Sequence, residues 1–340
     1  MKITSSIALL LLAAPPAHDL PPDEPLDLAP ASTTGQELVL RSSLSLTAEL
    51  EEVAVGALGL EEPIDGLGMT IEVEVEGVRE ETVRGAEDGT PTALEAHVVG
   101  KTAAVRVEAE EEGRDDLRIA GDFELAPHGR TLRMTRDDEG LVVFEELGEP
   151  DEALDEALIQ HWRLAPHFAH LLPDGAVAAG EPFELAAPWA GELSMGEVRQ
   201  VADVVHGWNG MGGPAIATTA AWVLEELELE GTGVVTAVEE GTAIIEYEFV
   251  GSYEVSDLVE MLLAADPPGP GGSGPPEGAT GSVEGEVALR GTGRFDLAAR
   301  QLVHLELEGS VSMGLELDLG VRTTASASAE VRYLATLEVE

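Results

Sequence analysis

Residues 304–321 read HLELEGSVSMGLELDLGV, in which apolar and polar residues alternate almost without interruption. Leucine, valine and methionine take every odd position from Leu305 to Val321 except Gly309, whereas acidic residues, serine and histidine take most of the even ones. Successive side chains of a strand point to opposite faces of its sheet, so this pattern predicts a long antiparallel strand with one apolar and one wet face. Gly309 and Gly314 leave a second option open, a pair of strands bent at one of them.

The same alternation recurs over most of the chain. It is clear in residues 71–76 and 105–110, and it continues over 325–339. Capping residues and apolar spacings of three and four predict helices at three places, residues 151–164, 194–206 and 256–265. The predicted fold is therefore mainly β, with two antiparallel, curved-sheet (half-barrel-like) modules and a few covering helices.

A faint internal repeat supports the division into two modules. Residues 121–126 (GDFELA) resemble residues 293–298 (GRFDLA). We therefore predict a first module over 36–180 and a second over 181–340. Residues 266–281 hold 11 Gly or Pro in 16 positions, which is typical of a mobile loop.

Composition and charge exclude several classes of function. The 340-residue chain has 66 acidic and 18 basic residues, a formal net charge of -48 and no cysteine. A field this negative repels nucleic acid and anionic membrane surfaces, so neither is expected as a partner. Without cysteine the chain has no disulfides, thiolate metal ligands or cysteine nucleophile. At roughly 150 residues per domain, the length corresponds to about two domains.

The start of the chain has the layout of a secretory signal peptide. Lys2 precedes the apolar run IALLLLAA, and Pro15-Pro16-Ala17 follows it, so residues 1–17 are expected to be removed on export. The run is too short to span a bilayer, and every other apolar stretch is interrupted by acids or glycine. Residues 18–35, rich in proline, are predicted to be a disordered leader. The expected location is extracytoplasmic in a bacterium: periplasm, cell envelope or medium.

A signal peptide, two similar β-rich halves, and a Phe-Asp-Leu strand followed by a turn and a long alternating strand resemble bacterial exported β-rich proteins of unknown function. More distantly, the pattern is similar to periplasmic lipoprotein-carrier proteins, whose curved half-barrel is closed by a helix over an apolar cavity. The resemblance covers residues 36–340 and carries over no catalytic residue. It implies that the apolar strand faces form either a packed core or a lipid-sized pocket.

Motifs of catalysis and metal binding are weak. His161, His167 and His170 cluster in HWRLAPHFAH, but Pro166 separates the first from the others and no HExxH pattern occurs. The acidic runs lack the spacing of a calcium loop, and residues 137–139 suit a hairpin turn between two strands instead. The glycine-rich stretch 207–214 lacks the ending of a phosphate-binding loop, and Ser194 lies outside a G-x-S-x-G elbow. No enzyme activity, cofactor or metal is therefore predicted.

Two non-catalytic functions are favoured, and a hydrolase or metal-dependent enzyme is kept as the third, less favoured alternative. The first is an exported envelope or periplasmic protein with a structural or interaction role, and the second is a carrier of a hydrophobic, lipid-like ligand. A carrier needs a cavity lined by the apolar strand faces. The side chains expected to line it are Trp162, Phe168, Trp208, Met211 and Met313. The partner is then a hydrophobic ligand or an envelope protein, and the oligomeric state is left open.

Overall fold

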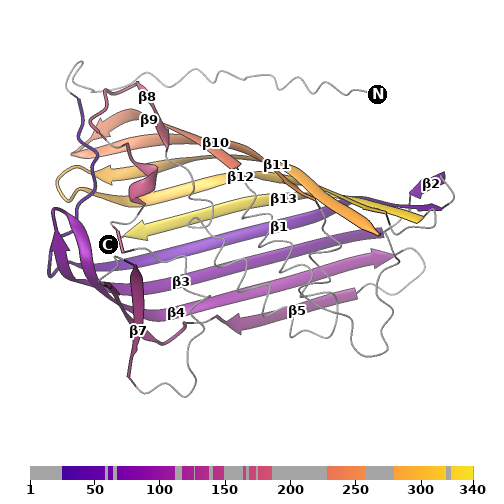
Figure 1. Ribbon diagram of the computed structural model, residues 1–340, viewed down its shortest axis with the longest axis horizontal. Coiled ribbons are helices and arrows are strands. Elements are labelled where there is room, and N and C mark those ends of the chain that lie inside the picture. Colours follow the sequence, from indigo (N-terminus) through magenta and orange to yellow (C-terminus); the bar gives the residue numbers. More distant parts are fainter. Residues whose placement is uncertain are drawn as a thin grey trace.

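One antiparallel sheet dominates the structure (Figure 1). The computed structural model describes residues 25–57, 60–63, 67–111, 117–125, 127–137, 141–148, 164–165, 168–173, 175–185, 228–256, 279–318 and 323–339. The mainly β, antiparallel prediction is confirmed. The described part of the chain holds no helix long and apolar enough to cross a membrane. The three predicted helices, apart from their end residues Leu164 and Ser256, the signal peptide and most of loop 266–281 lie outside the described residues.

Long strands make up most of the sheet. The first half of the chain contributes β1 (Glu37–Ala57), β2 (Leu60–Pro63), β3 (Leu67–Glu87), β4 (Thr90–Glu111), β5 (Leu117–Glu124), β6 (Thr131–Arg136) and β7 (Val142–Leu147). A short 3₁₀ helix, η2 (Ala169–Leu171), comes between the halves. The second half contributes β8 (Pro182–Leu185), β9 (Glu228–Glu239), β10 (Thr242–Val255), β11 (Thr280–Asp296), β12 (Gln301–Asp318) and β13 (Thr323–Val339).

The strands of the two predicted modules share this one sheet. Its order is β7-β6-β4-β3-β1-β13-β12-β11-β10-β9-β8, with β2 on β1 and β5 on β4. The first strand of one half and the last strand of the other pair from Leu40 opposite Val339 to Ala57 opposite Thr323. Figure 1 shows this pairing in the middle of the sheet, with β8 at one edge and β5 and β7 at the other. The sheet is not closed.

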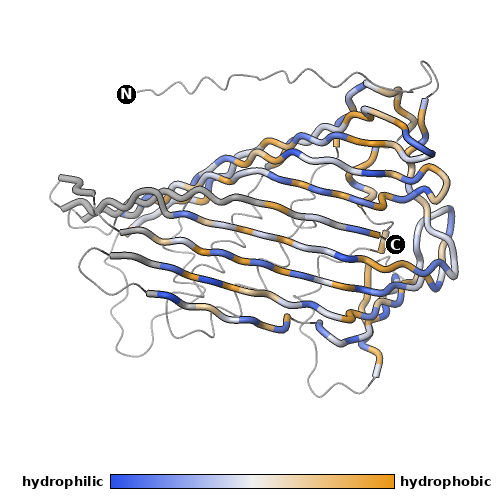
Figure 2. Tube along the Cα trace, turned by 180° about the vertical axis from the view of Figure 1, so that it is seen from behind, coloured by the Kyte–Doolittle hydropathy of each residue, from blue (hydrophilic) through white to orange (hydrophobic). Residues whose placement is uncertain are grey.

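Apolar and polar residues alternate along the strands, so each strand presents one apolar and one polar face. Figure 2 shows this alternation as changing colours along the strands. We call the face that carries the buried side chains the inner face and the opposite one the outer face. On β12, the fully buried Leu307 alternates with exposed Glu306 and Glu308. The strand runs unbroken through Gly309 and Gly314, so the single-strand option is confirmed over Gln301–Asp318.

Two hydrophobic clusters lie on the inner face. The large one extends across both halves of the chain, and its members include Leu40, Val75, Ala103, Phe249 and Leu307. The small one lies over β3, β4 and β6, and its members are Val83, Leu94, Ala96, Val98, Leu132, Met134 and Leu164.

The segment predicted as a disordered leader differs from that expectation where the structure describes it. Leu28 is fully buried in the large cluster, and Leu26 pairs with Val177 through two backbone hydrogen bonds of 2.8 and 3.0 Å. Arg300 donates from Nε to the Ala29 carbonyl at 3.0 Å. Leu26 and Leu28 thus dock the described part of this proline-rich stretch on the core.

The predicted hairpin around residues 137–139 is confirmed, since β6 and β7 pair antiparallel and the Leu141 amide donates to Asp137 Oδ1 at 2.9 Å. The repeated GDFELA and GRFDLA segments have different surroundings. Strand β11 turns back into β12, whereas β5 and β6 lie one after the other along β4.

Candidate functional site

Charged side chains interrupt the inner face at the boundary between the two hydrophobic clusters. On β3 the inner positions run from Val75 through Gly77 to Arg79, Glu81 and Val83. Arg79 Nε and Glu81 Oε1 are 2.6 Å apart, and the Glu81 side chain is completely buried. Burial of an ion costs several kcal/mol unless it is paired, so this pair has to remain intact in the fold.

Lys101 extends the charged region onto β4. It lies opposite Gly77 on β3, it is 7% exposed, and its carbonyl accepts a 2.9 Å hydrogen bond from the Leu125 amide. A shift of register between Val78 and Arg79 places one extra residue of β4 here, a β-bulge. Lys2 is the only other lysine of the chain. Lys101 is therefore a rare residue type here, and it is buried, which is uncommon for lysine.

A second ion pair lies farther along the same face. Arg130 Nη1 donates to both carboxylate oxygens of Glu146, at 2.9 and 3.1 Å. We call Arg79, Glu81, Lys101, Arg130 and Glu146 the inner charged belt. It holds three cations and two carboxylates, which is a net charge of +1, and all five are engaged within the protein.

A polar gap, made of Ser42, Gly77 and Lys101, interrupts the apolar side chains of the inner face. Ser42 of β1 is exposed, although Leu40 and Leu44 on either side of it are each 5% exposed. Its hydroxyl lies over Gly77, because a Cβ added at that glycine would be only 2.7 Å from Ser42 Oγ. Ser42, Gly77 and Lys101 therefore lie side by side across β1, β3 and β4.

Beyond this gap the inner face is apolar but incompletely covered. Leu46 and Val73 are cross-strand partners on β1 and β3, and both are half-buried. Four further half-buried side chains on β4 and β12 pack against the same cluster, so we define the inner apolar strip as Leu46, Val73, Val107, Val311, Met313 and Leu315. One buried row, made of Leu44, Val75 and Ala103, separates the strip from the gap.

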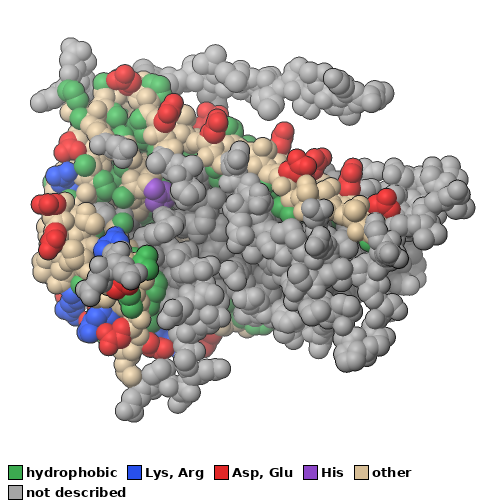
Figure 3. Space-filling view, in the orientation of Figure 1, with side chains coloured by type: hydrophobic (Ala, Val, Ile, Leu, Met, Phe, Trp, Pro, Cys, Tyr) green, Lys and Arg blue, Asp and Glu red, His purple; other side chains and the backbone are tan. Residues whose placement is uncertain are grey.

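The aromatic side of the inner face is closed by contrast. Rings lie over glycines of neighbouring strands, as Tyr247 does over Gly293, where an added Cβ would be 2.8 Å from the ring. Tyr247 stacks on Phe249 with ring centroids 6.0 Å apart. Burial raises the pKa of Tyr247 far above its ordinary range, and its hydroxyl has no hydrogen-bond partner among the described residues. Figure 3 shows green hydrophobic side chains gathered near η2 at this end of the molecule.

The sequence-predicted ligand residues are only partly placed. Trp162, Trp208 and Met211 lie outside the described residues. Phe168 precedes η2 in a left-handed backbone conformation, and Met313 lies on β12. Both are half-buried against the large cluster, where Met313 belongs to the inner apolar strip.

The histidine cluster is also only partly described. His161 and His167 lie outside the described residues, whereas His170 is half-buried with its ring 5.8 Å from that of Phe168. Within the described ranges no group of three or more His, Asp or Glu is arranged to hold a metal ion.

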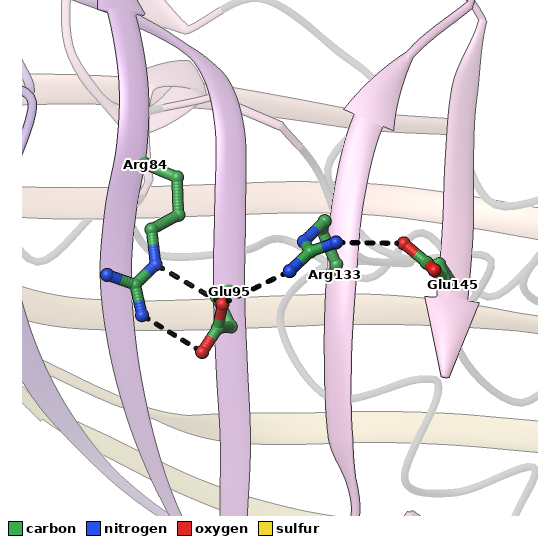
Figure 4. A network of polar contacts seen from close by, with 4 residues as sticks. All are labelled: Arg84, Glu95, Arg133 and Glu145. Carbon is green, nitrogen blue, oxygen red and sulfur yellow. Dashed lines mark hydrogen bonds and ion pairs between the residues drawn. The ribbon is translucent and has the colours of Figure 1, made fainter. Parts of the chain in front are cut away.

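An exposed chain of ion pairs lies on the outer face (Figure 4). Arg84 binds Glu95 through two hydrogen bonds of 3.2 and 3.0 Å, and Arg133 lies between Glu95, at 3.7 Å, and Glu145, at 3.1 Å. The hydrogen bond from Arg84 lowers the pKa of the Glu95 carboxyl. Exposed pairs of this kind contribute little stability each.

Sequence reasoning missed the inner charged belt. The signal for it was present, because Arg79 and Glu81 take apolar-face positions in the alternation that begins at Ile71. Lys101 was equally visible as the one lysine outside the predicted signal peptide. Their importance emerges only from the register that places β3 beside β4 and β1.

No family model and no curated protein sequence matches the chain. Among solved structures it is similar to OprB of Pseudomonas putida at low pH, with 7% identity, a TM-score of 0.22, and coverage of 88% of this chain and 92% of that one. It is also similar to the outer membrane protein OprG of Pseudomonas aeruginosa, with 6% identity, a TM-score of 0.17, and coverage of 91% and 98%. Scores this low carry no argument, so function is inferred from the chain's own residues.

Proposed function

We propose that the chain is an exported, non-catalytic protein of the bacterial envelope that carries a hydrophobic, lipid-like ligand on the inner face of its sheet. Export is supported by the signal-peptide layout of residues 1–17. The observation that carries the ligand hypothesis is the inner apolar strip. Its six side chains pack against the large hydrophobic cluster but are only half-buried.

Apolar surface in contact with water is unfavourable, at roughly 25 cal/mol per Å². A monomeric protein that keeps such a surface commonly uses it for binding. Acidic side chains on the outer face, such as Glu72 and Glu74 on β3, keep that face hydrated. The two faces of the same strands thereby separate a solvated outside from an apolar inside, which favours a carrier over a purely structural role.

Native mass spectrometry tests this proposal. The protein would be exported from a bacterial host with its own signal peptide, purified without detergent, and weighed under native and then denaturing conditions. A carrier shows a lipid-sized additional mass that is lost on denaturation. A bare mature mass, together with failure to take up added lipid from vesicles, would contradict the carrier hypothesis and leave the structural or interaction role.

A further inference from the structure

Apolar side chains are exposed at the edge of the sheet that β7 forms. Strand β7 pairs with β6 on one side, and no described strand pairs with its other side. Val143 on its outer face is 44% exposed, and Leu141, just before the strand, is 62% exposed. We infer that a second copy of this chain pairs with β7, as an antiparallel β7–β7 dimer whose two-fold axis passes between the two Val143 residues. This interaction surface does not depend on the proposed ligand.

The backbone of β7 has hydrogen-bonding groups that point toward such a partner. The Asp137 amide donates to the Leu141 carbonyl at 3.0 Å, so these two residues form a hydrogen-bonded pair of the β6–β7 hairpin. Hydrogen-bonded and non-hydrogen-bonded pairs alternate along an antiparallel ladder, so Val143 also directs its N–H and C=O toward β6. Those of Val142 and Phe144 therefore point away from β6. Backbone groups at a sheet edge are a template for another strand.

This edge is complementary to itself. When Val143 lies opposite Val143 of the second copy, Val142 of each strand lies opposite Phe144 of the other, and each such pair can exchange both of its N–H···O bonds. Val142 and Phe144 are half-buried and pack against the small hydrophobic cluster, so the pairing continues that cluster across the two-fold axis. On the outer face the two valines form a non-hydrogen-bonded pair, with Cα atoms about 4.5 Å apart.

Other registers match less well. Moving the two-fold axis to Phe144 would place Val142 opposite Glu146, whose carboxylate is 2.9 Å from Arg130. An apolar side chain would then lie opposite an ion pair. The register centred on Val143 instead joins apolar side chains on both faces, and cross-strand pairs of this kind stabilise a sheet.

Other edge strands have features that block such pairing. Strand β8 begins with Pro182, which has no N–H to donate, and it presents an exposed Glu184. Strand β5 exposes Asp122 and Glu124. Proline and charged side chains at an edge prevent pairing with other chains. Residues 142–144 of β7 read Val-Val-Phe and contain neither.

Charge also favours this part of the sheet. Two copies of a chain with a net charge of -48 repel each other, but β6 and β7 together hold two arginines and two glutamates, whose formal charges cancel. Glu145 is 3.1 Å from Arg133, at the end of the row of ion pairs in Figure 4. At physiological salt, exposed charges more than about 8 Å away are largely screened. Added salt should therefore strengthen the dimer.

Sedimentation velocity of the exported full-length protein tests the inference. One short strand pair is a small interface, so we expect a weak dimer that forms as the protein concentration rises from about 1 to about 300 µM. Val143→Lys places like charges directly opposite each other at the two-fold axis and should weaken the association about tenfold or more. Val250→Lys is the matched control, because Val250 is 50% exposed on β10, which has β9 and β11 on its two sides.

A single cysteine tests the register. The chain has no cysteine of its own, so Val143→Cys places one thiol of each copy at the two-fold axis, within the Cα separation of about 4.4–6.8 Å that a disulfide spans. Under mild oxidation this variant should form a crosslinked dimer much faster than Val250→Cys, which is the matched control.

Three results would overturn the inference. The first is a native protein that remains monomeric up to about 300 µM, the range in which a small interface should associate. The second is a dimer that Val143→Lys and Val250→Lys weaken equally, since it would use another surface. The third is Val143→Cys that crosslinks no faster than Val250→Cys. The native titration and the cysteine comparison do not require Val143→Lys to fold.

Discussion

The close contact between β11 and β12 predicts opposite outcomes for two glycines of the same strand. At Gly309 an added Cβ meets the Ala288 carbonyl oxygen and lies 2.8 Å from Leu289 Cα, both of which belong to the opposite strand. At Gly314 the nearest atom, Glu284 O, is 3.8 Å away, which is an ordinary van der Waals contact.

Gly309→Ala therefore forces β11 and β12 apart, because backbone atoms cannot rotate out of the way. Overpacking of this kind costs about 1–3 kcal/mol of the free energy of unfolding. Gly314→Ala is free of that strain, and the loss of chain entropy in its unfolded state stabilises the fold by up to about 1 kcal/mol.

Urea denaturation followed by far-ultraviolet circular dichroism measures both variants. With an m-value of about 3 kcal/mol per M, Gly309→Ala lowers the midpoint by about 0.3–1 M, whereas Gly314→Ala leaves it unchanged or raises it slightly. Equal destabilisation in the two variants would refute the reasoning, since it would mean that β11 and β12 do not pair in this register.

Three further predictions follow from individual side chains. Leu28→Ala should cost about 2–5 kcal/mol because Leu28 is fully buried, whereas Leu141→Ala, at a position 62% exposed, should leave the urea midpoint unchanged; equal midpoints would show that the leader does not dock. Because the pKa of Glu95 is lowered in the fold, its ionised form stabilises the protein above the unfolded-state pKa, and this contribution is lost as pH falls through the folded-state pKa; Glu95→Gln should therefore be less stable than the native protein at pH 7, the difference should shrink as the pH is lowered, and a constant difference in urea midpoint would contradict this. Burial raises the pKa of Tyr253 to about 12, so the tyrosinate absorbance lost in Tyr253→Phe should appear near pH 12 in native protein and near pH 10 in urea, and stability should fall as pH rises above 10; a native transition at pH 10 would show that the ring is solvated.

The fold class could be predicted from sequence because alternation is a local property. A strand such as β12 shows its apolar face in the parity of Leu305 and Leu307, whatever its neighbours are. The pairing of β1 with β13 could not be predicted in the same way. Nearly every strand alternates a similar set of residues, and register between segments about 300 residues apart leaves no local signal.

The candidate site was harder to predict for the same reason. The sequence-predicted ligand residues were large apolar side chains such as Phe168 and Met313, expected to line a cavity of apolar strand faces. Lys101, Ser42 and Gly77 come from three different strands. Lys101 is visible in the sequence as the one lysine outside the predicted signal peptide, but Ser42 and Gly77 do not stand out in their own segments. Only the register of β1, β3 and β4 brings them together into one polar gap on an apolar face.

The location of the ligand tests the central claim most directly. The chain has no cysteine, so single cysteines at adjacent positions 72 and 73 of β3 can each carry a fluorophore, one on the outer face and one in the inner apolar strip. A fatty acid with a spin label on its acyl chain would then be added to each labelled protein. The account predicts strong quenching of the label that replaces Val73 and little quenching of the label that replaces Glu72. Equal quenching at both positions, or stronger quenching at position 72, would contradict a ligand on the inner face.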